Sequence, residues 1–181
     1  MPETLMRRTH WCGQLRAEDA GKVVRLNGWV QRRRDHGGLI FVDLRDRSGV
    51  VQIVFSPEAG QELFATAEQL RNEHVVAVEG EVRRRLPGAE NPKLETGEIE
   101  VHVTACQHLS SARPAPFPID RPVDVDETVR LRYRYLDLRR PEMQRNLILR
   151  HRAAKAVRDF LSERGFLEIE TPMLTRSTPE G

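Results

Sequence analysis

An aromatic residue and several arginines lie close together in the segment 32–46 of the sequence. Within it, Ile40, Val42 and Leu44 alternate with other residues and mark the buried face of a strand. Phe41 has the opposite parity, so its ring is expected on the polar face, beside the arginines. An exposed ring next to cationic side chains is suited to stack on an unpaired nucleobase. The spacing leaves a second interpretation open, in which Phe41 lies under a loop or at a contact between domains.

Three polar side chains are expected on the same outer face as Phe41. Gln52 and Glu100 each lie between apolar residues of a predicted strand, and Arg34 ends the strand that precedes Phe41. Together the four residues would offer a stacking platform, a guanidinium group, an amide that donates and accepts, and a carboxylate that accepts from a base amine. Such a set is suited to reading bases. The alternative is that these are ordinary solvated surface residues.

The composition bounds the class of protein. The 181 residues carry a net charge of only +2, so total charge says little about partners and local clusters must decide. Cys12 and Cys106 match no metal-binding spacing, which indicates free thiols in a reducing compartment. We find no signal peptide and no apolar run of transmembrane length, and therefore expect a cytoplasmic protein without a membrane contact.

The spacing of apolar residues predicts five strands, with one helix between the third and the fourth. The strands are expected at about 24–31, 39–46, 51–55, 76–82 and 99–103, and the helix at 63–70. This order, with a glycine near the middle of the first strand, matches an all-β oligonucleotide-binding (OB) barrel of five strands and a short helix. A different five-stranded barrel is the alternative, and the position of the helix disfavours it.

The chain divides into three parts. We expect residues 1–110 to form the OB-fold domain and residues 111–130, which begin with a proline-rich stretch, to form a linker or hinge. Residues 131–181 have a different pattern and are expected to begin an α/β domain. There, helical spacing over 142–164 follows a proline and precedes a glycine, and a short strand is predicted at 166–170.

Two segments of this last part resemble a known family. The sequence LRYRYLDLRRP at 131–141 and the sequence GFLEIETPML at 165–174 resemble the start of the catalytic core of class II aminoacyl-tRNA synthetases. The second resembles motif 1, a helix and a strand that build the dimer interface in that family. An N-terminal OB domain narrows the resemblance to the aspartyl, asparaginyl and lysyl group. The segments 32–41, 132–143 and 177–181 are similar to bacterial aspartyl-tRNA synthetases.

The resemblance implies roles for the residues of the outer face. In this family the OB domain binds the tRNA anticodon. By position, Phe41 is similar to the ring that stacks on the central anticodon base, and Gln52 and Glu100 match anticodon-reading residues. Arg32 and Arg34 match the basic anticodon contacts.

The resemblance also implies the reaction. The full-length parent would be an aspartate–tRNA ligase that activates aspartate with ATP and Mg²⁺ and transfers it to the 3′ end of tRNA. Gly165, Phe166 and Pro172 would belong to the homodimer interface of motif 1, and Glu180 would contact the ammonium group of L-aspartate. Motifs 2 and 3 of the family are not among these residues. We therefore expect this portion alone to be inactive, with no catalytic residue, metal or cofactor of its own.

His36 and Gly88 bear on which tRNA is charged. They resemble the pair found in non-discriminating bacterial members, which charge both tRNA-Asp and tRNA-Asn. These tRNAs differ at the third anticodon base, and a neutral imidazole presents a donor or an acceptor according to its tautomer. An amidotransferase that acts on Asp-tRNA-Asn is then a candidate downstream partner. The alternative is a solvated loop histidine and a turn glycine.

A function from another class remains open. The chain could be a stand-alone OB-fold module that binds single-stranded nucleic acid without catalysis. The segment that resembles motif 1 disfavours this interpretation, because a free binding module has no use for half of a dimer interface.

Overall fold

The computed structural model describes residues 6–172 and residue 174. The chain forms two compact units that meet between Ala115 and Pro116. This boundary falls inside the segment 111–130 in which the sequence predicts a linker. No helix of the described residues combines the length and the apolar character needed to cross a membrane.

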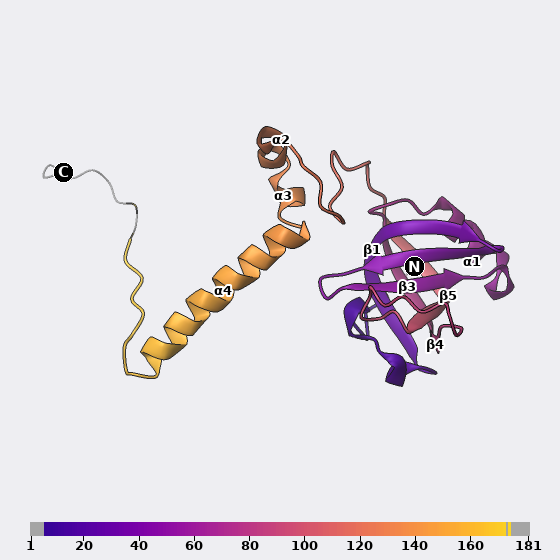
Figure 1. The fold of residues 1–181 in the computed structure, drawn as a ribbon, viewed down its shortest axis with the longest axis horizontal. Coiled ribbons are helices and arrows are strands. Elements are labelled where there is room, and N and C mark those ends of the chain that lie inside the picture. Colours follow the sequence, from indigo (N-terminus) through magenta and orange to yellow (C-terminus); the bar gives the residue numbers. More distant parts are fainter. Residues whose placement is uncertain (1–5, 173, 175–181) are drawn as a thin grey trace, which may run out of the picture. The chain divides into compact units, whose positions relative to one another are not determined.

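The first unit is a closed five-stranded barrel with strand order β1-β2-β3-β5-β4 (Figure 1). All pairs of neighbouring strands are antiparallel except β3 and β5, which are parallel. The predicted OB fold is thereby confirmed. The elements of this unit are β1 (Val23–His36), β2 (Leu39–Arg45), β3 (Val50–Phe55), α1 (Gln61–Gln69), β4 (Val75–Arg84) and β5 (Ile99–Ser110), with the short 3-10 helices η1 (Cys12–Gln14), η2 (Ala17–Asp19) and η3 (Pro57–Ala59).

Alternating apolar side chains fill the barrel. Ile40, Val42 and Leu44 of β2 are at most 2% exposed, whereas the residues between them are half-exposed. Leu70, directly after α1, and Leu15 of the N-terminal segment join the same core. Each fully buried side chain of this size contributes about 1.5–3 kcal/mol to folding through the hydrophobic effect. The core therefore fixes which face of every strand points outward.

Strand β1 is longer than the sequence predicts. It does not end at the three arginines but continues through them to His36, and its last residues pair with the first residues of β2. The turn between the two strands consists of Gly37 and Gly38, whose φ angles are 59° and 78°. Glycine adopts positive φ without a steric penalty, and two such residues form the tight turn that matches the twist of a hairpin.

A β-bulge in β1 reverses the faces of its second half. Val30 pairs with Leu44, but the next pair is Arg32 with Asp43, so one extra residue lies between them. Arg32 and Arg34 have the same parity as the buried Val30, and regular alternation would turn them toward the core. The extra residue instead places them on the outer face, opposite outward-facing residues of β2.

The second unit begins with two short helices and continues with a long one. These are α2 (Glu127–Arg132), α3 (Arg134–Asp137) and α4 (Pro141–Ser162). The side chain of Asp137 is fully buried and accepts hydrogen bonds from Arg130, at 3.0 Å, and from Arg134. Burial opposes ionisation of this carboxyl, but the hydrogen bond and charge of Arg130, with the charges of Arg134 and Arg140, outweigh it and lower the pKa of Asp137.

The long helix begins and ends where the sequence predicts. Pro141 occupies its first turn, and Gly165, with φ of 82°, follows its C-terminal end. The backbone N–H of Phe166 donates to Leu161 O at 3.1 Å and closes the end of the helix. The strand predicted at 166–170 was wrong: the described residues after Gly165 form no strand. A strand needs a neighbouring backbone to pair with, and no strand lies beside this segment in the described part of the unit.

Gly28 tests the packing of β1 against β2. A Cβ at this position would lie 2.5 Å from Arg45 O, closer than any carbon and oxygen can approach without a shift of the backbone. We expect Gly28→Ala to lower the free energy of unfolding by about 1–3 kcal/mol, measured by urea denaturation. Val23→Ala, an exposed position of the same strand, is the control and should change it by less than about 0.5 kcal/mol. Equal stability of the Gly28 variant and the wild type would contradict this account of the packing.

Candidate nucleic-acid interface

The outer face of the barrel carries the candidate base-reading residues on four neighbouring strands. Phe41 of β2 is half-exposed and lies directly opposite Arg34 of β1, so both side chains are on the same side of the sheet. Asp43 of β2 is opposite Gln52 of β3. Gln52 is only 7% exposed, because its neighbours on this outer face cover it, and Glu100 of β5 is among them.

A chain of hydrogen bonds joins these side chains. Arg34 Nη2 donates to Asp43 Oδ1 at 2.5 Å and to Gln52 Oε1 at 3.3 Å. Gln52 Nε2 donates to Glu100 Oε2 at 2.8 Å, and Glu100 Oε1 lies 2.8 Å from His102 Nε2. Each group is therefore held in one orientation before any ligand arrives. Fixed donors and acceptors discriminate between bases better than mobile ones, since no ordering is needed on binding.

The network also controls the charge of its carboxylates. Burial alone would raise the pKa of Glu100, but hydrogen bonds from His102 and Gln52, with the charges of His102 and Arg85, lower it below its ordinary value of 4.5. For Asp43, burial outweighs the nearby arginines and raises the pKa above its ordinary value of 3.8. Glu100 is therefore an ionised acceptor at neutral pH.

Two buried donors of the interface lack an acceptor within the described residues. They are Arg34 Nε and Arg85 Nη2. Arg85 holds its position through a hydrogen bond from Nε to Ile99 O at 3.0 Å, and burial lowers the pKa of its guanidinium while Glu100 and Asp43 oppose that shift. A buried N–H without a partner is unfavourable by about 1–3 kcal/mol. An acceptor on a bound ligand would remove this penalty.

The other three candidate residues lie outside this network. Arg32 is exposed and opposite Asp43, and its charge acts on that carboxyl. His36 is exposed at the end of β1, and Gly88 is exposed in the loop between β4 and β5. Gly88 has φ of 86°, and its backbone N–H donates to Glu90 at 2.7 Å. The turn therefore supplies a conformational reason for glycine at position 88 that is independent of tRNA choice.

Sequence reasoning missed three residues of this interface. Asp43 has the same parity as Phe41, and His102 has the same parity as Glu100, so alternation along each strand could have found both. Arg85 follows β4 in a loop, where alternation gives no direction. Only the folded barrel brings its guanidinium close to Glu100.

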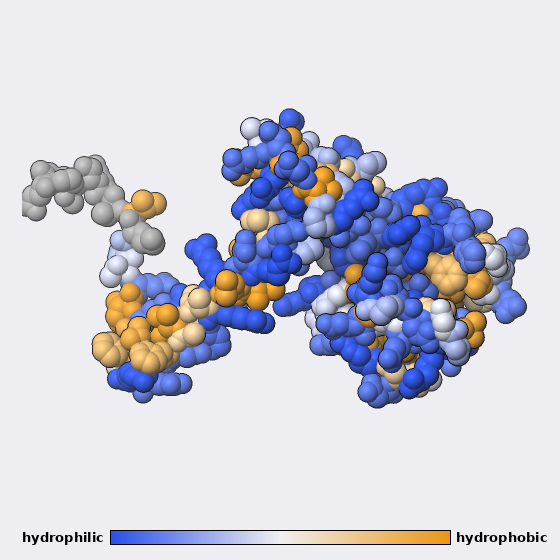
Figure 2. All heavy atoms as spheres, viewed as in Figure 1, coloured by the Kyte–Doolittle hydropathy of each residue, from blue (hydrophilic) through white to orange (hydrophobic). Residues whose placement is uncertain are grey.

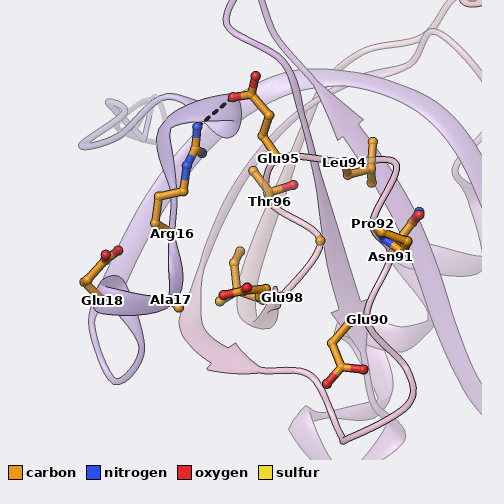
Figure 3. A pocket seen from close by; sticks show the side chains of 12 residues that line it. Arg16, Ala17, Glu18, Glu90, Asn91, Pro92, Leu94, Glu95, Thr96 and Glu98 are labelled. Carbon is orange, nitrogen blue, oxygen red and sulfur yellow. Dashed lines mark hydrogen bonds and ion pairs between the residues drawn. The ribbon is translucent and has the colours of Figure 1, made fainter.

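A hollow of about 620 Å³ elsewhere on the barrel unit has the opposite charge. It lies between η2 and the loop that precedes β5, and its lining includes Glu18, Glu90, Glu95 and Glu98 (Figure 3). Arg16 crosses it in an ion pair with Glu95 at 2.7 Å. An excess of carboxylates repels phosphate groups, which disfavours this hollow as a nucleic-acid site.

The C-terminal candidates follow α4 in the second unit. Phe166 is 63% exposed, Pro172 is exposed, and Gly165 lies three residues after the last residue of α4. Apolar side chains gather at the C-terminal end of α4 and beside it (Figure 2). Exposed apolar patches of this kind mark contact surfaces. Glu180, the candidate contact for L-aspartate, lies outside the described residues.

Family models match both units of the chain. An OB-fold nucleic acid binding domain matches residues 24–109, and the class II tRNA synthetases of the D, K and N group match residues 126–181. The second match disfavours a stand-alone binding module. Isolated OB-fold chains do occur among solved structures: an OBody bound to hen egg-white lysozyme is 25% identical, with a TM-score of 0.54, over 61% of this chain and 100% of its own.

Curated relatives are similar along almost the whole chain. Aspartate–tRNA(Asp/Asn) ligase of Heliobacterium modesticaldum is 65% identical over 178 residues, which are 98% of this chain and 29% of the relative. The protein of the same name from Moorella thermoacetica is 65% identical over 97% of this chain and 29% of its own length. The chain thus spans about 29% of the length of these relatives. The asparaginyl-tRNA synthetase structure from Pyrococcus horikoshii has a TM-score of 0.77 and 32% identity, over 92% of this chain and 38% of its own.

The two family matches, over residues 24–109 and 126–181, assign the chain to the class II aminoacyl-tRNA synthetases of the D, K and N group. Within that class, the chain belongs to the bacterial aspartyl-tRNA synthetases and comprises their OB-fold domain and the beginning of their catalytic domain.

The pKa of Glu100 predicts a pH dependence of stability. Because the pKa is lower in the folded chain than in the unfolded chain, the carboxylate stabilises the fold above pH 4.5, and this contribution is lost as the pH falls through the lowered value. Glu100→Gln should therefore show a smaller fall in unfolding free energy between pH 7 and pH 3, measured by urea denaturation. Glu68→Gln, at an exposed position of α1, is the control. A wild-type slope in the Glu100 variant would contradict the assignment.

Proposed function

We propose that the protein to which these residues belong is an aspartate–tRNA ligase that charges both tRNA-Asp and tRNA-Asn in the cytoplasm. In this proposal the barrel recognises the anticodon. The observation that carries it is the network of Arg34, Gln52 and Glu100 beside the half-exposed ring of Phe41. The names and the 65% identity of the bacterial relatives support the choice of aspartate and of both tRNAs.

The geometry suggests what each group does for the anticodon. Phe41 stacks on the central base. After its hydrogen bonds to Glu100 and Arg34, the amide of Gln52 still has one N–H and one acceptor lone pair. This remaining donor and acceptor together complement the edge of a uracil. Glu100, ionised at neutral pH, accepts from a base amine, while Arg32 binds the phosphate backbone.

ATP and Mg²⁺ belong to the proposed reaction of the whole protein. Magnesium prefers carboxylate and water oxygens, and ATP-dependent enzymes hold it with one or two carboxylates and the phosphates. The described residues bring no three His, Cys, Asp or Glu side chains together at one point. We therefore assign both groups to other parts of the catalytic core.

We also infer that a second copy of the protein covers the apolar surface near the end of α4. Phe160, Phe166 and Leu167 are 53%, 63% and 84% exposed, which is high for side chains of this size. The backbone of residues 166–170 has no strand beside it in the described part of the unit, and a copy of the same segment would supply one. This surface is the proposed homodimer interface.

Charging of tRNA-Asn with aspartate has a chemical consequence. The product carries aspartate where the codon calls for asparagine, so an amidotransferase must convert it before use in translation. Such an enzyme is the proposed downstream partner. We propose that His36 and Gly88 allow the third anticodon base of either tRNA to bind. His36 does so by changing its tautomer, and Gly88 does so by leaving space for the base. Among the described residues, apart from the two chain neighbours of Gly88, no heavy atom lies within 4 Å of a Cβ built there.

Removing the ring of Phe41 tests the anticodon site. Phe41→Ala should weaken binding of the anticodon stem-loop of tRNA-Asp by about 1–3 kcal/mol, the usual contribution of a base stacked on an aromatic side chain. Binding is measured by anisotropy of the labelled RNA, and circular dichroism checks the fold. The control is Phe160→Ala, which removes an exposed ring from α4. Unchanged affinity in a folded Phe41 variant would reject the stacking role.

Replacing His36 tests the choice of tRNA. In the full-length protein, His36→Leu should reduce charging of tRNA-Asn more than charging of tRNA-Asp, because leucine offers no hydrogen bond to the third base. A change of about 1–2 kcal/mol in the ratio of the two kcat/KM values is expected, measured at fixed salt. Equal losses for both tRNAs would show that His36 is a general contact.

Gly88→Lys should shift the same ratio in the same direction. Because Gly88 has φ of 86°, a lysine there is also expected to reduce stability by about 1–2 kcal/mol. The kcat/KM ratio is therefore compared with the unfolding free energy of the same variant. A loss of stability alone, with an unchanged ratio, would leave Gly88 with only its structural role.

A further inference from the structure

A second hollow on the barrel unit, of about 390 Å³, combines aromatic and cationic side chains. It is bounded by the N-terminal segment, the first half of β1, the turn after β2, and the facing ends of β4 and β5. The chain contains two tryptophans, and both line this hollow. The lining residues used below are Arg8, Trp11, Asn27, Trp29, Asp46 and Arg47.

Two guanidinium groups converge on one ring in this hollow. The guanidinium carbon of Arg8 lies 4.0 Å from the centroid of the Trp11 ring, and that of Arg47 lies 5.8 Å from it. Both arginines are exposed. A guanidinium stacked on an aromatic ring keeps its N–H edge available, and that edge binds phosphate through two parallel hydrogen bonds.

The charge of the hollow favours an anion. No ion pair of Arg8 or Arg47 is found among residues 6–172. Asp46 is the one carboxylate in the described lining, and it is already engaged. Its oxygens accept hydrogen bonds from Cys12 N at 2.7 Å and from the backbone N and the Oγ of Ser48 at 2.7 and 2.6 Å. The described lining thus combines two arginines with one carboxylate, so positive charge is in excess there.

Asn27 offers an acceptor at the same place. Its Nδ2 donates to Met6 O at 3.0 Å, which fixes the orientation of the amide. Its Oδ1 is buried and has no partner within the described residues. A buried acceptor without a donor is unfavourable, so an N–H group on a ligand would stabilise it. Nucleobases carry such N–H groups on their edges.

The hollow lies on the same outer face as the anticodon site. Trp29 of β1 is directly opposite Arg45 of β2. Arg45 lies four residues after Phe41 on the same strand, and both have the parity of the outward-facing residues. Four residues of a strand extend over about 13 Å. A single-stranded RNA held at Phe41 covers such a distance within a few nucleotides. The RNA that is proposed to bind at Phe41 is therefore within reach.

We propose that this hollow binds a further unpaired nucleotide of the same tRNA, outside the three anticodon bases. Its phosphate is held by Arg8 and Arg47, its base stacks against the Trp11–Arg8 pair, and a base N–H donates to Asn27 Oδ1. This inference rests on the proposed anticodon function of the barrel. The excess positive charge favours a nucleotide over a protein segment as the occupant.

The position of the two tryptophans provides a direct test. The 181-residue chain is titrated with the anticodon stem-loop of tRNA-Asp, and two signals are followed. Anisotropy of the labelled RNA measures total binding, and the fluorescence of the two tryptophans, which line this hollow, reports on the hollow itself. We expect the RNA to change the tryptophan fluorescence in step with binding. Arg47→Ala should weaken binding roughly tenfold, as for loss of a charge-assisted hydrogen bond. It should also reduce the slope of log K against log salt by about 0.7.

Controls separate this inference from the proposed function. Arg164→Ala removes another exposed arginine stacked on a ring, Phe160 on α4, and should leave affinity and salt slope unchanged. Arg47→Lys keeps the positive charge but not the planar guanidinium. Its salt slope should therefore be close to that of the wild type, while its affinity should remain below the wild-type value. If the RNA binds and Phe41→Ala weakens it, but tryptophan fluorescence and the Arg47→Ala variant are unaffected, the nucleotide site is rejected and the anticodon site stands. If the RNA does not bind at all, both proposals fail.

Discussion

The candidate interface depends on one extra residue in β1. The bulge between Val30 and Arg32 allows a single strand to contribute its first half to the core and Arg32 and Arg34 to the outer face. Without it, Arg34 would lie on the same face as Val30 and its guanidinium would face the apolar interior, where an unpaired charge is strongly unfavourable. The closed barrel permits no compensating shift, because β1 is bonded to β4 on one side and to β2 on the other.

With Arg34 turned outward, its guanidinium connects β1 to β2 and β3, and Gln52 extends the connection to β5. The network therefore spans four strands, of which β5 is distant from the other three in sequence. It lowers the pKa of Glu100 and fixes the amide of Gln52, while Arg34 Nε and Arg85 Nη2 remain without acceptors in the described chain. A site that is rigid and yet has unpaired buried donors has the properties expected for reading bases by hydrogen bonds.

The two units differ in how far their apolar side chains are buried. In the barrel, every strand has its apolar face covered by the strands and the helix around it. In the second unit, α4 has no buried residue, and Phe160 and Phe166 are more than half exposed. The predicted strand at 166–170 does not form because strand pairing needs a second backbone. The proposed homodimer would supply that backbone and cover the exposed apolar side chains of this chain, which spans about 29% of the length of its relatives.

The sequence by itself determined the OB fold, the position of Phe41 on the outer face, and the limits of α4, because alternation and helix-end residues are local signals. It also contained the family resemblance that the relatives bear out. The tertiary structure alone decided the bulge, the position of Arg85 near Glu100, and the meeting of Arg8 and Arg47 at Trp11. Those features depend on strand pairing and on contacts between residues far apart in the chain, which spacing along a single segment does not encode.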